Sequence, residues 1–170
     1  MKFLNLIPLI FFSLGIFSPS NIVYAEGPDD YKVLLSKNKK FSIPKVETFL
    51  KEGDAYIKNG EFDKAKESFD KARNLAKQLA GFYGDLNNSF RGLDARIPSE
   101  MAEKGKKSLK IWAESNARLA AVYKRKNQPE VSVPLYVEII RLMSPTSSEG
   151  KEAYENLVQL GFVETTYRGS

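Results

Sequence analysis

The chain contains no cysteine and no histidine in its 170 residues. Without cysteine there are no disulfide bonds and no thiol nucleophiles, so packing alone must hold the fold together. Without histidine there are no serine–histidine nucleophile systems, no histidine-based proton transfer and none of the usual zinc sites. We therefore expect no metal, no cofactor and no catalytic residues, and we expect that the protein is not an enzyme.

A hydrophobic run long enough to cross a membrane comfortably is also missing. The longest run, residues 3–17, is short and interrupted. Lys2 precedes it, and Val23 and Ala25 occupy the −3 and −1 positions of a cleavage site. This pattern is typical of a secretory signal peptide. We expect residues 1–25 to be removed, leaving an exported protein without a stable membrane span; the alternative is that they remain as an anchor.

Neither sign of charge dominates the sequence. There are 26 basic and 21 acidic residues, and removing Lys2 with the signal peptide leaves 25 against 21, a net charge of +4. So small an excess favours solubility over nucleic-acid binding. The remaining 145 residues (170 − 25) are enough for one domain with its own core.

Helical periodicity begins after a short leader. Residues 26–44 contain Pro28 and Pro44 and show no sustained period, so they are predicted to be a leader or linker. Residues 45–161 are predicted to form an α-helical domain, and residues 162–170 a C-terminal tail. Two apolar stripes at helical spacing flank Asn59-Gly60, which predicts a helical hairpin with a tight turn.

One segment of this domain also fits a β-strand. Apolar residues alternate from Val131 to Ile139, and Pro134 would interrupt a helix unless it lies in the first turn. We still favour a helix here, because the neighbouring helical segments leave no partner strand.

The hairpin resembles a tetratricopeptide repeat, a 34-residue unit of two helices. The matching segment is residues 49–72, FLKEGDAYIKNGEFDKAKESFDKA, in which Gly53, Tyr56 and Phe69 occupy repeat positions. A weaker copy covers residues 117–145, with Tyr123 equivalent to Tyr56. The resemblance covers two units, residues 46–79 and 113–146, separated by a segment about one repeat long that fits the pattern poorly.

This resemblance implies an all-α, helical-hairpin repeat stack with a C-terminal capping helix. Residues 147–160 supply that helix, and Gly161 is a typical glycine after a helix end. Such stacks bind other proteins in a groove lined by the first helix of each unit. The implied function is a non-catalytic, exported scaffold or assembly factor that binds a protein or peptide. By register, the groove candidates are Asp54, Lys58, Asn88, Arg91, Arg118 and Arg125.

The three arginines among these candidates indicate an acidic or carboxylate-bearing partner. The mature chain is also similar to small exported proteins of cyanobacteria and chloroplasts, which implies the periplasm or the thylakoid lumen. A second hypothesis is a closed up-down bundle resembling the extrinsic lumenal subunits of photosystem II, a structural cap on a membrane complex. A stack leaves a groove open, whereas a bundle buries those positions.

Residues 85–96, DLNNSFRGLDAR, begin like a calcium-binding loop and include a glycosylation sequon at Asn87. A calcium loop needs glycine at position 6 and glutamate at position 12, where this segment has Phe90 and Arg96. The motif is therefore not a metal site. The spacing of its apolar residues predicts an amphipathic helix that continues toward Pro98.

Overall fold

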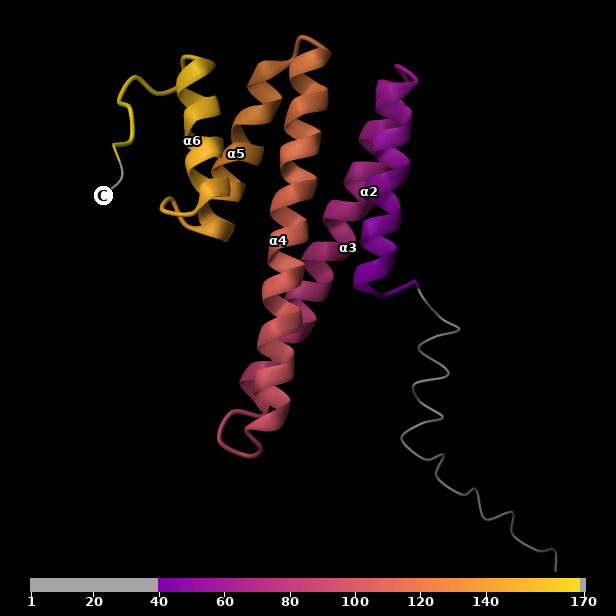
Figure 1. Ribbon diagram of the computed structural model, residues 1–170, viewed down its shortest axis with the longest axis vertical. Coiled ribbons are helices and arrows are strands. Elements are labelled where there is room, and N and C mark those ends of the chain that lie inside the picture. The colour runs from indigo at the N-terminus through magenta and orange to yellow at the C-terminus, as the bar shows by residue number, and fades with distance from the viewer. Residues whose placement is uncertain (1–39, 169–170) are drawn as a thin grey trace, which may run out of the picture.

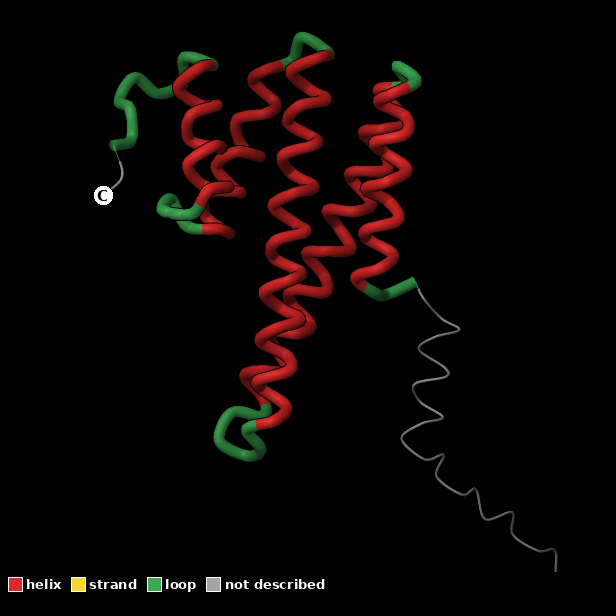
Figure 2. Tube along the Cα trace, viewed as in Figure 1, coloured by secondary structure: helices red, strands yellow, loops and turns green. Residues whose placement is uncertain are grey.

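The computed structural model describes residues 40–168, and this part of the chain is helical without β-strands (Figures 1 and 2). The helices are α2 (Ile43–Lys58), α3 (Phe62–Ser89), α4 (Arg96–Arg125), α5 (Pro129–Met143) and α6 (Ser148–Gln159). The predicted all-α class is confirmed, and the alternating segment from Val131 to Ile139 lies within α5. The predicted signal peptide and most of the leader lie outside the described residues. None of the helices in residues 40–168 is long and apolar enough to span a bilayer.

The helices form two layers. In Figure 1, α2, α4 and α6 lie toward the viewer, and α3 and α5 lie behind them. Extensive contacts join each helix to the next along the chain, and a smaller contact joins α2 to α4. Among the described helices, no extensive contact connects α2 with α5 or α6. The array is therefore open along the face formed by α2, α4 and α6, unlike the closed bundle of the second hypothesis.

The three helices of the front layer end in the same way. After each of them one residue adopts a positive φ: Gly60 (74°), Asn127 (58°) and Gly161 (76°). The backbone N–H of the following residue then donates to a carbonyl five residues back, that of Tyr56, Tyr123 or Leu157, at 2.9, 2.9 and 3.1 Å. These are Schellman motifs, in which the left-handed residue lets the chain reverse while satisfying the last carbonyls. The turn predicted at Asn59-Gly60 and the helix end predicted at Gly161 are confirmed.

Close packing between α2 and α3 depends on a small residue facing an aromatic ring. Gly53 is buried in α2, and Phe69 of α3 is 1% exposed. A Cβ atom added at Gly53 would lie under 3.0 Å from three atoms of the Phe69 ring. The absence of a side chain therefore sets the distance between the two helices. The core continues through buried residues of every helix: Val46, Leu50, Ala72, Leu79, Ile111, Leu119, Val122, Ile139, Ala153 and Leu157.

The segment between the two repeat-like units does not form a hairpin of its own. It lengthens α3 to 28 residues and α4 to 30, and the distal parts of both helices project beyond α2, α5 and α6 (Figure 1). We call this projecting part, residues 80–107, the arm. The sequence predicted that the amphipathic helix of residues 85–96 continues toward Pro98, and this prediction is wrong. The chain reverses at residues 90–95, where Gly92 has a φ of 85°, and Pro98 lies in the first turn of α4, where its missing N–H costs no hydrogen bond.

Candidate functional site

A groove runs along the front face of the molecule on both sides of α4. Its larger part is a cavity of about 570 Å³ between α4 and α6, with α5 at its base. A second cavity of about 370 Å³ lies between α2 and α4. Lys110 and Glu114 line both cavities, so the two adjoin along α4. We call them together the α4 groove.

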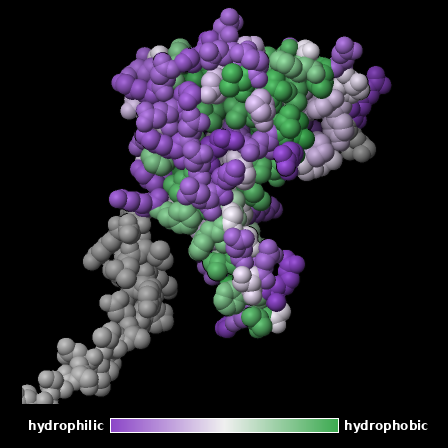
Figure 3. Space-filling view, turned by 180° about the vertical axis from the view of Figure 1, so that it is seen from behind, coloured by the Kyte–Doolittle hydropathy of each residue, from purple (hydrophilic) through white to green (hydrophobic). Residues whose placement is uncertain are grey.

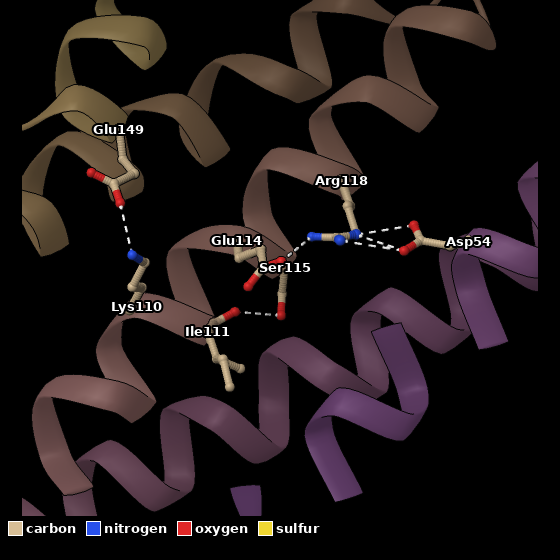
Figure 4. Close-up of polar contacts among 7 residues, drawn as sticks. All are labelled: Asp54, Lys110, Ile111, Glu114, Ser115, Arg118 and Glu149. Atoms are coloured by element: carbon tan, nitrogen blue, oxygen red, sulfur yellow. Dashed lines mark hydrogen bonds and ion pairs between the residues drawn. The ribbon is translucent and has the colours of Figure 1, made fainter. Parts of the chain in front are cut away.

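A row of alternating charges crosses this groove from α6 to α2 (Figure 4). Lys110 Nζ lies 3.6 Å from Glu149 Oε1 of α6. Farther along α4, Arg118 Nη1 donates to Glu114 Oε1 at 2.7 Å, and its Nε donates to Asp54 Oδ1 of α2 at 3.0 Å. The row joins α4 to both flanking helices of the front layer.

Arg118 is held in this row by its two carboxylates. Burial alone would lower the pKa of Arg118, but the hydrogen bonds from its guanidinium to Asp54 and Glu114 outweigh that effect and raise the pKa above its ordinary value. The guanidinium is therefore always charged and already bonded in the free protein. A carboxylate arriving from a partner would have to displace Asp54 or Glu114.

The residues predicted from the sequence do not come together at one site. Asp54 and Arg118 meet, but they bind each other. Arg125 lines the cavity between α4 and α6. Lys58 is exposed near the end of α2 and is not among the residues that line the α4 groove.

The structure places Asn88 and Arg91 far from the groove, at the end of the arm. There Arg91 Nη2 donates to Asn88 Oδ1 at 3.1 Å, and both residues are exposed. Their placement in the groove assumed a middle repeat, whereas in the described residues this segment lengthens α3 and α4 and forms the arm. The helical register therefore carries them away from α2, α4 and α6.

The register of the repeat pattern also placed Ala121 in the groove, and it lines the α4–α6 cavity. Other groove residues were missed by sequence reasoning. Ala113 and Ala117 precede Ala121 at every fourth position of α4 and line the same cavity. This spacing is visible in the sequence. It predicts a groove lining only if α4 is long enough to include all of these residues, and the repeat pattern implied a shorter helix. Glu149 and Glu152 were missed because α6 was considered only as a cap, whereas it forms one wall of the cavity.

The base of the α4–α6 cavity carries a small polar cluster. The hydroxyl of Tyr136 on α5 donates to Asn156 Oδ1 of α6 at 3.1 Å, and Lys124 Nζ of α4 contacts the same oxygen at 3.0 Å. Burial and, secondarily, the nearby charge of Glu152 raise the pKa of Tyr136, so its phenol stays protonated. This cluster joins α4, α5 and α6 at one end of the groove. No group of three or more acidic, histidine or cysteine side chains positioned to hold a metal ion occurs in residues 40–168.

The opposite face has a different character. Viewed from behind, apolar residues are exposed in a patch on the helical body, beside a hydrophilic part, and along the arm (Figure 3). A cavity of about 630 Å³ lies between α3 and α5, but two of the charged residues that line it, Arg73 and Glu138, bind each other at 2.6 Å. Asn116 and Trp112 of α4 also donate to Glu138 Oε2, at 2.8 and 3.3 Å. These bonds cross-link α3, α4 and α5, so we assign them a structural role and place the candidate site in the α4 groove.

Comparison with known protein families and with curated proteins finds no match for this chain. The resemblance to tetratricopeptide repeats therefore depends on the residues and geometry of the chain itself.

Proposed function

We propose that the protein is a non-catalytic binding module of tetratricopeptide-like architecture, whose α4 groove binds a segment of a partner protein. In this proposal α2–α3 and α4–α5 are two repeat units, and α6 is the first helix of a third. The Schellman motifs at the ends of α2, α4 and α6 support this assignment. Tyr123 and Leu157 hold equivalent positions and are 34 residues apart (157 − 123), the length of one repeat. Tyr56 and Tyr123 are 67 apart because the arm lies between them.

The single observation that carries the functional proposal is the cavity between α4 and α6. Its volume of about 570 Å³ is within the usual range of roughly 300–1,000 Å³ for ligand pockets. Small side chains line it on α4, and charged side chains surround it. In helical repeat arrays, the open face between first helices is the usual binding surface. The groove of this chain lies on that face.

We further propose that the protein is exported and acts in the periplasm or the thylakoid lumen as a scaffold or assembly factor. The support is the N-terminal pattern of a basic residue, an apolar run and a cleavage site in residues 1–25. The acidic partner expected from the arginines now depends on Arg125, because Arg118 is already bound and Arg91 lies at the end of the arm.

Site-specific photo-crosslinking tests the binding proposal. A photoreactive residue at Ala121, in the groove, is expected to form partner adducts in intact cells, whereas one at Asn74, exposed on α3, is not. Ala117→Trp should abolish the adducts because the indole fills the cavity. Ala102→Trp is the matched control, since Ala102 is exposed on the same helix but lies in the arm. Equal adducts from both positions, or adducts that survive Ala117→Trp, would refute the groove as the binding surface.

A further inference from the structure

We infer that the α4–α6 cavity binds a peptide segment in which an apolar side chain stands between a basic and an acidic side chain. The basic group meets Glu152 and the acidic group meets Arg125. This inference rests on the proposed function, because it specifies the chemistry of the partner for the same groove.

The apolar requirement follows from the floor of the cavity. Ala113, Ala117 and Ala121 are four residues apart on α4, so their methyl groups lie along one face of the helix. Ala153 of α6 and Ile139 of α5 complete this floor, and both are buried. Methyl groups leave space above them and offer no hydrogen-bond partners. An apolar side chain is therefore the group that gains most by entering.

The charge requirement follows from which charges around the cavity are already engaged. Lys110 contacts Glu149, Glu114 contacts Arg118, and Lys124 contacts Asn156. A partner charge that approached any of these would compete with an existing bond. In contrast, the side chains of Glu152 and Arg125 make no hydrogen bond or ion pair with residues 40–168. They are the two charges that a ligand engages without breaking a contact.

These two charges lie on opposite walls of the cavity, at different positions along the groove. Arg125 follows Lys124, which contacts Asn156 of α6, and Glu152 lies one turn before Asn156. The two are thus offset along the groove by about one helical turn of 5.4 Å. A peptide segment that carries one basic and one acidic side chain at that offset can pair with both charges. A uniformly acidic segment would meet Arg125 but be repelled by Glu152 and Glu114.

Selection from a display library of short random-sequence peptides tests this inference. The bait is the chain from residue 26 to residue 170, in parallel with Glu152→Gln, Arg125→Gln, Ala117→Trp and the control Ala102→Trp. Selection on the unmodified chain should enrich peptides with a basic and an acidic residue on either side of an apolar one. Glu152→Gln should remove the preference for the basic residue, and Arg125→Gln the preference for the acidic one. For a selected peptide, Glu152→Gln and Arg125→Gln should each raise the dissociation constant about 3- to 10-fold, Ala117→Trp should abolish binding, and Ala102→Trp should leave it unchanged.

The outcomes separate the inference from the proposed function. Peptides that are blocked by Ala117→Trp but show no charge preference would overturn the inference and leave the groove as a binding site. Peptides that bind equally well to Ala117→Trp, or no enrichment at all, would overturn both. Because all four substitutions are at exposed positions, circular dichroism of each variant should match that of the unmodified chain.

Discussion

Arg118 of α4 and Asp54 of α2 form an ion pair, with 3.0 Å between Nε and Oδ1, that bridges two helices with little other contact. The register of the repeat pattern predicted both residues as groove residues available to a partner. They line the front face, but each neutralises the other. The pair joins α2 to α4, so in the α4–α6 cavity the charges left open are Arg125 and Glu152.

Breaking this pair should lower the stability of the protein by a small but measurable amount. We expect Asp54→Ala to lower the free energy of unfolding by about 0.5–1 kcal/mol, because both side chains are partly exposed. A double-mutant cycle with Arg118→Ala, followed by urea denaturation, should give a coupling energy of the same size. Lys58→Ala, at an exposed site one turn later on α2, serves as the control and should change stability by less than about 0.5 kcal/mol. A coupling energy of zero would show that the pair does not bridge the helices in solution.

Packing of α2 on α3 should depend strongly on the missing side chain of Gly53. Gly53→Ala improves helix propensity, but its methyl group would overlap the Phe69 ring. We expect the overlap to dominate and to lower the free energy of unfolding by about 1–3 kcal/mol. Gly81→Ala is the matched control, because it lies in α3 with no atom near its added Cβ, and it should stabilise the protein by about 0.5–1 kcal/mol. Thermal unfolding of both variants measures the contrast, and stabilisation by Gly53→Ala would contradict the packing.

The features predicted from sequence were those encoded locally. The turn at Asn59-Gly60 and the end at Gly161 need residues that tolerate positive φ, and such residues are visible in the sequence. The arm was not predictable in this way. A separation of 67 residues between Tyr56 and Tyr123 fits either an inserted repeat or two lengthened helices, and only packing distinguishes these. The groove wall on α6 was missed for the same reason, since the approach of Glu149 to Lys110 joins residues 39 positions apart (149 − 110).

The cluster around Glu138 should make stability depend on pH. Burial raises the pKa of Glu138, but hydrogen bonds from Arg73, Asn116 and Trp112 outweigh this and lower it below the ordinary value of 4.5. A carboxyl with a lowered folded-state pKa binds fewer protons in the folded than in the unfolded protein. Its stabilisation is therefore present above pH 4.5 and is lost as the pH falls through the folded-state pKa.

Glu138→Gln isolates this contribution from those of the other carboxylates. At neutral pH we expect the variant to be less stable by about 1–3 kcal/mol, because Arg73 is left partly buried without its carboxylate. The difference from the unmodified chain should shrink as the pH falls below 4.5. Urea denaturation across the acidic range measures it. A difference that is independent of pH would mean that the charge of Glu138 does not stabilise the fold.

The arm should open before the helical body does. Met101 is the one buried residue between positions 80 and 107, whereas α4 carries eight buried residues from Ser108 onward. Few buried contacts mean that the amides of the arm can exchange by local opening, without global unfolding. We expect hydrogen exchange in residues 82–104 to be faster than in residues 111–122 of the same helix pair by about tenfold or more. Asn87→Ala removes the bond from Asn87 Nδ2 of α3 to the carbonyl of Pro98 of α4 (2.8 Å), which joins the two helices of the arm, and should accelerate exchange in the arm alone. Glu103→Ala, at an exposed position of the arm, should leave it unchanged. Uniform protection along α4 would show instead that the arm unfolds together with the body.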